Sequence, residues 1–352
     1  MNEIMSIKIG NQFVGEDLPC YIIAEAGVNH NGSLEHAKKL IDKAVNAGAD
    51  AIKFQTFKAE NIASVYADKA DYQKEVTSTD ETQFEMLKKL ELSETDFIEL
   101  ADYCAKKHIT FLSSPFDHDS VDLLEKCNIQ AYKIPSGELT NHPLLKKIAK
   151  TNKPVILSTG MSYLIEVQET VELLINNGCS SIALLHCTTS YPTPPEDVNL
   201  KAMQTLSHHL NLPVGYSDHT KGINIALAAV AIGGCIIEKH FTLDRNLPGP
   251  DHKASLEPDE LKEMIRIIRE NELAMGDGIK RPTHNEKKIM KIARKSIIAK
   301  IDLNEGEIIN KRSIEVKRPG TGISPVNYDN VIGREIIRKV KKDMPITWED
   351  VG

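Results

Sequence analysis

The chain has 352 residues, of which 41% are apolar and 26% are charged, the proportions of an ordinary globular protein. Its formal net charge of −7 at pH 7 argues against a general binder of nucleic acid or of anionic membranes. No apolar run in the sequence has the length of a signal peptide or a membrane span, so we expect a cytoplasmic protein.

The first part of the chain alternates short apolar runs with amphipathic segments. Residues 1–20 are centred on a Gly-Asn turn and predict a β-hairpin. Residues 33–48 begin with serine and end on glycine, as a capped helix does. The apolar runs have strand length and number eight: 21–27, 51–56, 109–115, 131–137, 154–160, 182–188, 212–218 and 235–242.

Eight strands alternating with helices over residues 21–276 predict an α/β fold, the (β/α)₈ TIM barrel. An open doubly wound sheet is the alternative. We favour the barrel because polar residues follow every predicted strand, whereas an open sheet gathers its site at one switch point.

The remainder of the chain has a different character. Residues 277–296 are basic and rich in turn formers, and we interpret them as a linker. Residues 297–352 contain short alternating pieces and predict a small, mostly β second domain. A domain of this size has little core of its own, so we expect it to pack against a larger body.

Two histidines stand at equivalent places in the predicted barrel. His219 follows the strand at 212–218, and His240 lies near the end of the strand at 235–242. The carboxyl ends of parallel strands joined by a right-handed crossover lie on the same face. Two converging imidazoles predict a divalent metal site, for which Mn²⁺, Mg²⁺ and Co²⁺ are equally suitable on ligand type.

Other polar residues at the strand ends complete a possible active site, among them His186 at the strand 182–188. Lysines with hydroxyl groups suit a phosphate or a carboxylate, and carboxylates can move protons. Lys53 and Lys133 could instead be simple ion-pair partners of Glu25 and Glu138, but a buried lysine without a function is costly. Alternation along the strand places Lys239 on the face opposite His240, outside the metal site.

Several motifs in chain order resemble the sialic acid synthase family: AEAGVNHNGS, IKFQTFKAE, YKIPSGELTN, ILSTGM, LHCTTSYPTPPEDVNL, VGYSDHT, IEKHFTLD, GPDHKAS and KRPGTGISP. The resemblance covers nearly the whole chain. It implies a TIM barrel joined to a C-terminal antifreeze-like (SAF) domain, and a homodimer in which that domain is swapped onto the partner's active site. The family condenses phosphoenolpyruvate with a 2-acetamido sugar aldehyde and water, and releases phosphate by C–O cleavage.

The resemblance also implies roles for individual residues. It makes His219 and His240 the ligands of a metal that is usually manganese, which would activate the sugar aldehyde. It makes Glu25 and Glu238 candidates for stabilising a positive charge at C2 of phosphoenolpyruvate, with Glu25 handling a proton. The implied phosphoenolpyruvate contacts are Lys53, Lys133, Ser136, Ser158, Thr189 and Ser217, with Thr189 standing where relatives often carry asparagine. The implied sugar contacts are Gln55, Glu138, Tyr191, Asp251 and Arg318, the last reaching the neighbouring subunit, together with a residue near Ser78.

The sequence leaves the exact reaction open. The first interpretation is N-acetylneuraminate synthase acting on N-acetylmannosamine. Legionaminate synthase, acting on a 2,4-diacetamido-6-deoxy sugar, and pseudaminate synthase are the alternatives. A Schiff-base pyruvate aldolase is a weaker one, because the paired histidines argue against it. An ice-binding role for the C-terminal domain is disfavoured by its charged, mixed composition.

Overall fold

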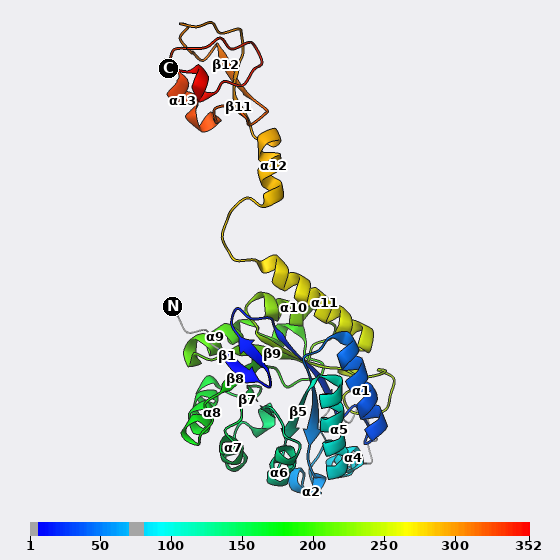
Figure 1. The fold of residues 1–352 in the computed structure, drawn as a ribbon. Coiled ribbons are helices and arrows are strands. Elements are labelled where there is room, and N and C mark those ends of the chain that lie inside the picture. The colour runs from blue at the N-terminus through cyan, green and yellow to red at the C-terminus, as the bar shows by residue number, and fades with distance from the viewer. Residues whose placement is uncertain (1–5, 70–80) are drawn as a thin grey trace. The chain divides into compact units, whose positions relative to one another are not determined.

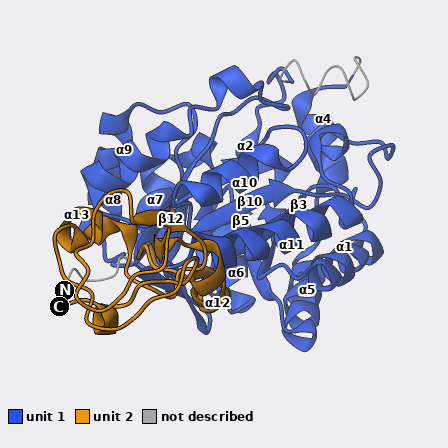
Figure 2. Cartoon of the chain, turned by 90° about the horizontal axis from the view of Figure 1, so that it is seen from above, with its two compact units in different colours: residues 1–276 blue, residues 277–352 orange. Residues whose placement is uncertain are grey.

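The computed structural model describes residues 6–69 and 81–352. The chain divides into two compact units, residues 1–276 and residues 277–352, coloured separately in Figure 2. Each unit is described by itself. Within the described ranges, every helix is too short or too polar to cross a membrane.

A hairpin precedes the barrel. Strands β1 (Ser6–Ile9) and β2 (Gln12–Gly15) pair in antiparallel register. Gly10 makes the turn with φ +58°, a backbone conformation that glycine adopts without strain. The hairpin buries Ile7, Ile9 and Val14 while its outer residue Phe13 stays exposed.

The first unit is built on eight strands of one parallel sheet, counted within the described residues. They follow the order β5-β4-β3-β10-β9-β8-β7-β6, and the two end strands β5 and β6 also lie against each other, which completes the barrel. The predicted TIM barrel is therefore confirmed (Figure 1). The strands are β3 (Tyr21–Gly27), β4 (Ala51–Thr56), β5 (Thr110–Pro115), β6 (Tyr132–Ile134), β7 (Val155–Ser158), β8 (Ile182–His186), β9 (Val214–Asp218) and β10 (Ile236–His240).

Helices cover the outside of the barrel (Figure 1). The predicted caps of the first helix are present, because Ser33 accepts from the amide of His36 and Gly48 takes a left-handed conformation. The helices are α1 (Leu34–Ala47), α2 (Ala59–Ile62), α4 (Gln83–Leu90), α5 (Glu94–Lys107), α6 (His118–Lys126), α7 (His142–Ala149), α8 (Leu164–Asn176), α9 (Lys201–Leu210), α10 (Asn224–Ala231) and α11 (Pro258–Met275).

Alternation along the strands separates two cores. Outward residues such as Ile22, Ile52 and Leu184 form a large cluster with the helices. Inward residues at the amino end of the barrel form a second cluster with the hairpin, which we call the floor: Ile7, Ile9, Val14, Tyr21, Ile23, Ala51, Leu112, Ala131, Ile156, Ala183, Leu185, Cys235 and Ile236. The floor leaves the inward positions at the carboxyl end for other side chains.

The second unit begins with helix α12 (His284–Ala293), inside the stretch interpreted as a linker. That interpretation missed a capping box in which Thr283 accepts from the amide of Glu286 while the Glu286 carboxylate accepts from the amide of Thr283. Strands β11 (Ser296–Ala299) and β12 (Ile314–Lys317) pair in antiparallel register. Short helical turns follow at η4 (Pro325–Asn327), α13 (Tyr328–Val331) and η5 (Trp348–Asp350), around a small apolar core.

Candidate active site

Four charged side chains fill the inside of the barrel at its carboxyl end, above the floor. We call them the mouth cluster: Glu25, Lys53, Lys133 and Glu238. Lys53 Nζ lies 3.1 Å from Glu25 Oε2 and 3.4 Å from Glu238 Oε2. Lys133 Nζ lies 3.3 Å from Glu238 Oε1. Each of the four residues is at most 3% exposed, so the charges interact in a region from which water is largely excluded.

The two carboxyl groups of the mouth cluster have opposite proton affinities. Burial raises the pKa of Glu25 to about 7, against the opposing effect of Lys53 and with a further rise from Glu238. Burial also disfavours the charge on Glu238, but Lys133 and Lys53 outweigh it and lower the Glu238 pKa to about 2. Near neutral pH one carboxyl group can therefore exchange a proton while the other stays ionised.

His219 is held by one ring nitrogen, and its other ring nitrogen faces two hydroxyl groups. Its Nδ1 lies 2.7 Å from the carbonyl oxygen of Thr188, to which it donates, and this leaves the lone pair on Nε2. Nε2 lies 3.2 Å from the Tyr191 hydroxyl and 3.4 Å from Ser217 Oγ. Burial lowers the pKa of His219 to about 4, so the ring is neutral at pH 7, as a metal ligand must be.

His240 faces the same space from the next strand. The ring centroids of His219 and His240 are 5.7 Å apart. Within the described residues the buried Nδ1 of His240 has no hydrogen-bond partner, and the nearest carboxylate oxygen, Asp251 Oδ2, is 3.9 Å away. Burial, followed by the proximity of His219, lowers the His240 pKa well below its usual range.

These two neutral imidazoles fit a divalent cation. In the described ranges no cluster of three or more histidine, cysteine or carboxylate groups is placed to hold one. His219 and His240 would therefore leave most of the coordination sphere to water or to substrate oxygens, which suits a site that must bind a substrate.

A second group of polar side chains gathers around Gly160. Ser136 Oγ accepts a hydrogen bond from the Gly160 amide at 2.9 Å and lies 3.1 Å from Cys187 Sγ. A methyl group added to Gly160 would lie 2.6 Å from Thr189 Oγ1, so Thr189 shares this wall with Ser136. Ser158 Oγ is buried without a hydrogen-bond partner in the described part of the chain.

Of the remaining predicted sugar contacts, two lie in the site and one lies beyond the end of a strand. Gln55 and Tyr191 join the site, because Gln55 Nε2 lies 3.5 Å from Glu25 Oε1 and the Tyr191 ring lies 4.2 Å from that of His219. Glu138 lies in a 3₁₀ helix, η1 (Ser136–Glu138), beyond the end of β6, and its carboxylate accepts from Asn141.

Two predicted contacts lie outside the described part of the barrel. Arg318 belongs to the second unit, where its Nε donates to the carbonyl of Ala293. The region around Ser78 is outside the described residues.

The sequence interpretation also misplaced one residue and missed others. His186, grouped with the strand ends, is turned outward and lies 2.7 Å from the carbonyl oxygen of Val198. Ser114, which accepts from Lys53 at 3.3 Å, was missed although it lies at an inward position of a predicted strand. The carbonyl of Thr188 was missed because no side-chain pattern reports a backbone contact. Lys239 points away from His219 and His240, to the outer face of β10, as the alternation predicted, and pairs with Asp218 at 2.8 Å.

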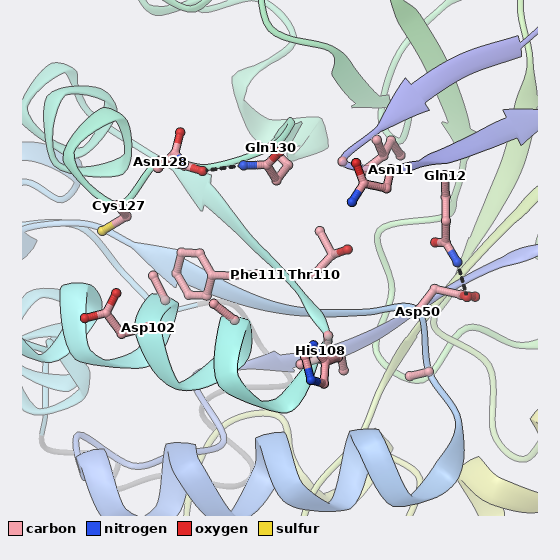
Figure 3. Close-up of a pocket in the computed structure, with 16 residues that line it drawn as sticks. Asn11, Gln12, Asp50, Asp102, His108, Thr110, Phe111, Cys127, Asn128 and Gln130 are labelled. Carbon is pink, nitrogen blue, oxygen red and sulfur yellow. Dashed lines mark hydrogen bonds between the residues drawn. The ribbon is translucent and has the colours of Figure 1, made fainter.

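Two cavities of about 630 Å³ lie away from the mouth cluster. One, at the amino end of the barrel, is lined by the hairpin turn, α5 and β5 (Figure 3). Two pairs of its polar groups bind each other, Gln12 with Asp50 and Gln130 with the Asn128 carbonyl (Figure 3). The other, between α8 and α9, adjoins Thr189 from outside the barrel.

Comparisons with known proteins identify the family of the chain. A family model described as the NeuB family matches residues 40–280, and a SAF domain model matches residues 294–352. N,N'-diacetyllegionaminic acid synthase of Campylobacter jejuni is 54% identical over 92% of this chain and 97% of its own length. The protein of the same name from Legionella pneumophila is 46% identical over 96% of both chains.

A solved structure of N-acetylneuraminic acid synthetase from Leptospira borgpetersenii superimposes with a TM-score of 0.72 and 36% identity, covering 82% of this chain and 97% of that one. The family model spans most of the barrel, and the relatives span almost the whole chain. The chain therefore belongs to the NeuB family of sialic acid-type synthases and ends in a SAF domain.

Proposed function

We propose that the chain is an N,N'-diacetyllegionaminate synthase, which condenses phosphoenolpyruvate with the aldehyde form of a 2,4-diacetamido-6-deoxy hexose. The observation that carries the choice of sugar is the higher identity to the legionaminic acid synthases than to the N-acetylneuraminic acid synthetase. N-acetylmannosamine, the substrate first expected from the sequence, thereby becomes the second candidate.

The charges and hydroxyls of the site support phosphoenolpyruvate as the first substrate. It carries a phosphate and a carboxylate, and Lys53 and Lys133 offer two buried ammonium groups at the barrel mouth. The hydroxyls of Ser136 and Thr189 share the wall around Gly160, and the unpartnered Ser158 hydroxyl is free to donate. These groups would replace the water that the anion loses on entry.

His219 and His240 would hold the divalent cation, for which we propose Mn²⁺. Bound there, the cation supplies Lewis-acid polarisation of the aldehyde carbonyl. Tyr191, Gln55 and Asp251 lie around this position and would contact the sugar. We also propose a homodimer in which Arg318 of one subunit reaches the sugar in the other, supported by the KRPGTG motif at residues 317–322.

The two carboxyl groups would divide the remaining work. C3 of phosphoenolpyruvate forms a bond to the aldehyde carbon, and positive charge develops at C2. Glu238 stays ionised because its pKa is about 2, so its negative charge stabilises C2. Glu25, with a pKa of about 7, takes a proton from the water that adds at C2.

The two protons of the added water end on the sugar oxygen and on the released phosphate. The first proton of the water passes through Glu25 to the former aldehyde oxygen, which becomes a hydroxyl. The second leaves with phosphate when the C2–O bond of the tetrahedral intermediate breaks and the 2-keto group forms.

The test is phosphate release from phosphoenolpyruvate by the full chain with each sugar in turn, with and without Mn²⁺. We expect Mn²⁺-dependent release that is at least about tenfold faster, in kcat/KM, with the diacetamido sugar than with N-acetylmannosamine. The reverse preference would make the chain a neuraminate synthase. Trapping of a lysine by borohydride with pyruvate, without phosphate release, would instead indicate Schiff-base chemistry.

A further inference from the structure

A buried ion pair lies on the outer face of the two strands that carry the histidines. Lys239 and Asp218 occupy paired positions of β10 and β9, and each is at most 1% exposed. Lys239 Nζ lies 2.8 Å from Asp218 Oδ2 and 2.5 Å from the carbonyl oxygen of Thr220. The second carboxylate oxygen, Asp218 Oδ1, accepts from the Thr220 amide at 2.8 Å.

Stability alone is a poor explanation for this pair. Removing two charges from water costs several kcal/mol each, and a well-packed apolar pair of similar volume is often as stable. The same two strands carry the paired Ser217 and Glu238 on their inner face, where Ser217 Oγ lies 2.8 Å from Glu238 Oε1. The outer pair therefore lies directly behind the site.

The contacts of the pair enclose His219. Asp218 and Thr220 are the residues on either side of it, and Lys239 binds both of them. The His219 carbonyl accepts from the Thr193 amide at 2.9 Å, and its ring donates to Thr188. With the backbone fixed on both sides and one ring nitrogen engaged, the direction of the other ring nitrogen is determined.

We propose that Asp218 and Lys239 are positioning residues, which fix the turn at residues 218–220 so that His219 presents Nε2 to the divalent cation. This inference rests on the metal site of the proposed function. Metal ligands are oriented by the groups around them, and loss of such groups typically weakens metal affinity by about 10- to 100-fold.

The test measures Mn²⁺ binding to the full chain, without substrates, from the electron paramagnetic resonance signal of free Mn²⁺. The variants are Lys239→Met and the double variant Asp218→Leu, Lys239→Met, which removes both charges from the buried pair. Tyr132→Phe is the matched control, because Tyr132 is also buried on the outer face of the barrel and its hydroxyl lies 2.7 Å from Glu125.

We expect the double variant to fold and to bind Mn²⁺ about 10- to 100-fold more weakly than the wild type, while Tyr132→Phe binds it normally. Lys239→Met leaves Asp218 unpaired, so it should bind as weakly and unfold at a lower temperature. Wild-type affinity in a folded double variant would overturn the inference. Failure of the double variant to fold would also overturn it, because the pair would then be needed for the fold itself.

The same experiment separates this inference from the proposed function. If wild type and His219→Ala bind Mn²⁺ equally, the proposed metal site is wrong and the inference is wrong with it. If the wild type binds Mn²⁺ through His219 but releases no phosphate with either sugar, the proposed reaction is wrong and the positioning role stands on the binding data.

Discussion

The inward-facing side chains at the two ends of the barrel are of different kinds. At the amino end the floor is apolar and is closed by the hairpin residues Ile7, Ile9 and Val14. At the carboxyl end the mouth cluster places buried ammonium and carboxyl groups within 3.4 Å of one another. Burial of apolar surface stabilises the fold, whereas burial of charge opposes it. The burial of the apolar floor therefore offsets the cost of burying the charges of the mouth cluster.

The largest effect on activity is expected at the proposed metal site. His219→Ala should lower Mn²⁺-dependent phosphate release by at least about 10³-fold, because polarisation of the carbonyl is worth several kcal/mol. The measurement is kcat/KM for the sugar at a saturating concentration of phosphoenolpyruvate. His209→Ala, on the exposed face of α9, is the control and should be silent. Retention of activity in His219→Ala would mean that the mouth works without a metal held by this ring.

A smaller loss is expected when the proton-exchanging carboxyl group is neutralised. Burial raises the Glu25 pKa to about 7, so kcat/KM of the wild type should fall as the pH drops through about 7 and the base becomes protonated. Glu25→Gln should lower kcat/KM by about 10²- to 10⁴-fold and abolish that inflection. An inflection that persists in the variant would assign it to another group.

Filling the space at the wall around Gly160 should have a moderate effect. Gly160→Ala places a methyl group 2.6 Å from Thr189 Oγ1 and 2.8 Å from Ser136 Oγ, so we expect KM for phosphoenolpyruvate to rise by about tenfold with kcat nearly unchanged. Gly137→Ala is the control, because nothing lies within 4 Å of the added methyl group. An equal effect of the two variants would argue against a substrate-binding wall here.

A change at the floor should leave activity alone. Ile9→Ala should lower the free energy of unfolding of the barrel by about 2–4 kcal/mol through the cavity it creates, with kcat unchanged. Phe13→Ala, on the exposed side of the hairpin, should change it by less than about 0.5 kcal/mol. Far-ultraviolet circular dichroism is the appropriate probe, since the single tryptophan, Trp348, reports on the C-terminal unit. A fall in kcat would show that the floor also shapes the mouth.

Sequence reasoning recovered the barrel because its signals are local. Strand length, helix caps and the period of two along each strand are all readable, and they placed Lys239 outside the site correctly. Partners across strands were not readable. The alternative of simple ion pairs named Glu25 for Lys53, which is present, and Glu138 for Lys133, which pairs with Glu238 instead, because the stagger of a barrel decides which strand ends meet. The different pKa values of Glu25 and Glu238 follow from that same arrangement.

The sequence predictions were wrong where the placement depends on a single residue. His186 is the last residue of β8, and a strand boundary that differs by one position turns its side chain from the site to the helices. The linker interpretation gave weight to glycine and proline around residue 280 and overlooked the Thr283–Glu286 capping box. Arg318 illustrates a different limit, because its proposed role involves a second subunit.

The floor also sets the order of folding. Its hairpin is made before the barrel strands, but it packs with Ile156, Ala183 and Ile236, which are made much later. Strand β3 likewise waits for β10, since the amide of Tyr21 donates to the carbonyl of Cys235. Contacts so distant in sequence slow folding and keep early segments exposed. Although β1 pairs with β2 and β3 pairs with β4, the apolar face of the hairpin and the other edge of β3 therefore lack their partners until β10 has emerged, and they stay exposed during synthesis.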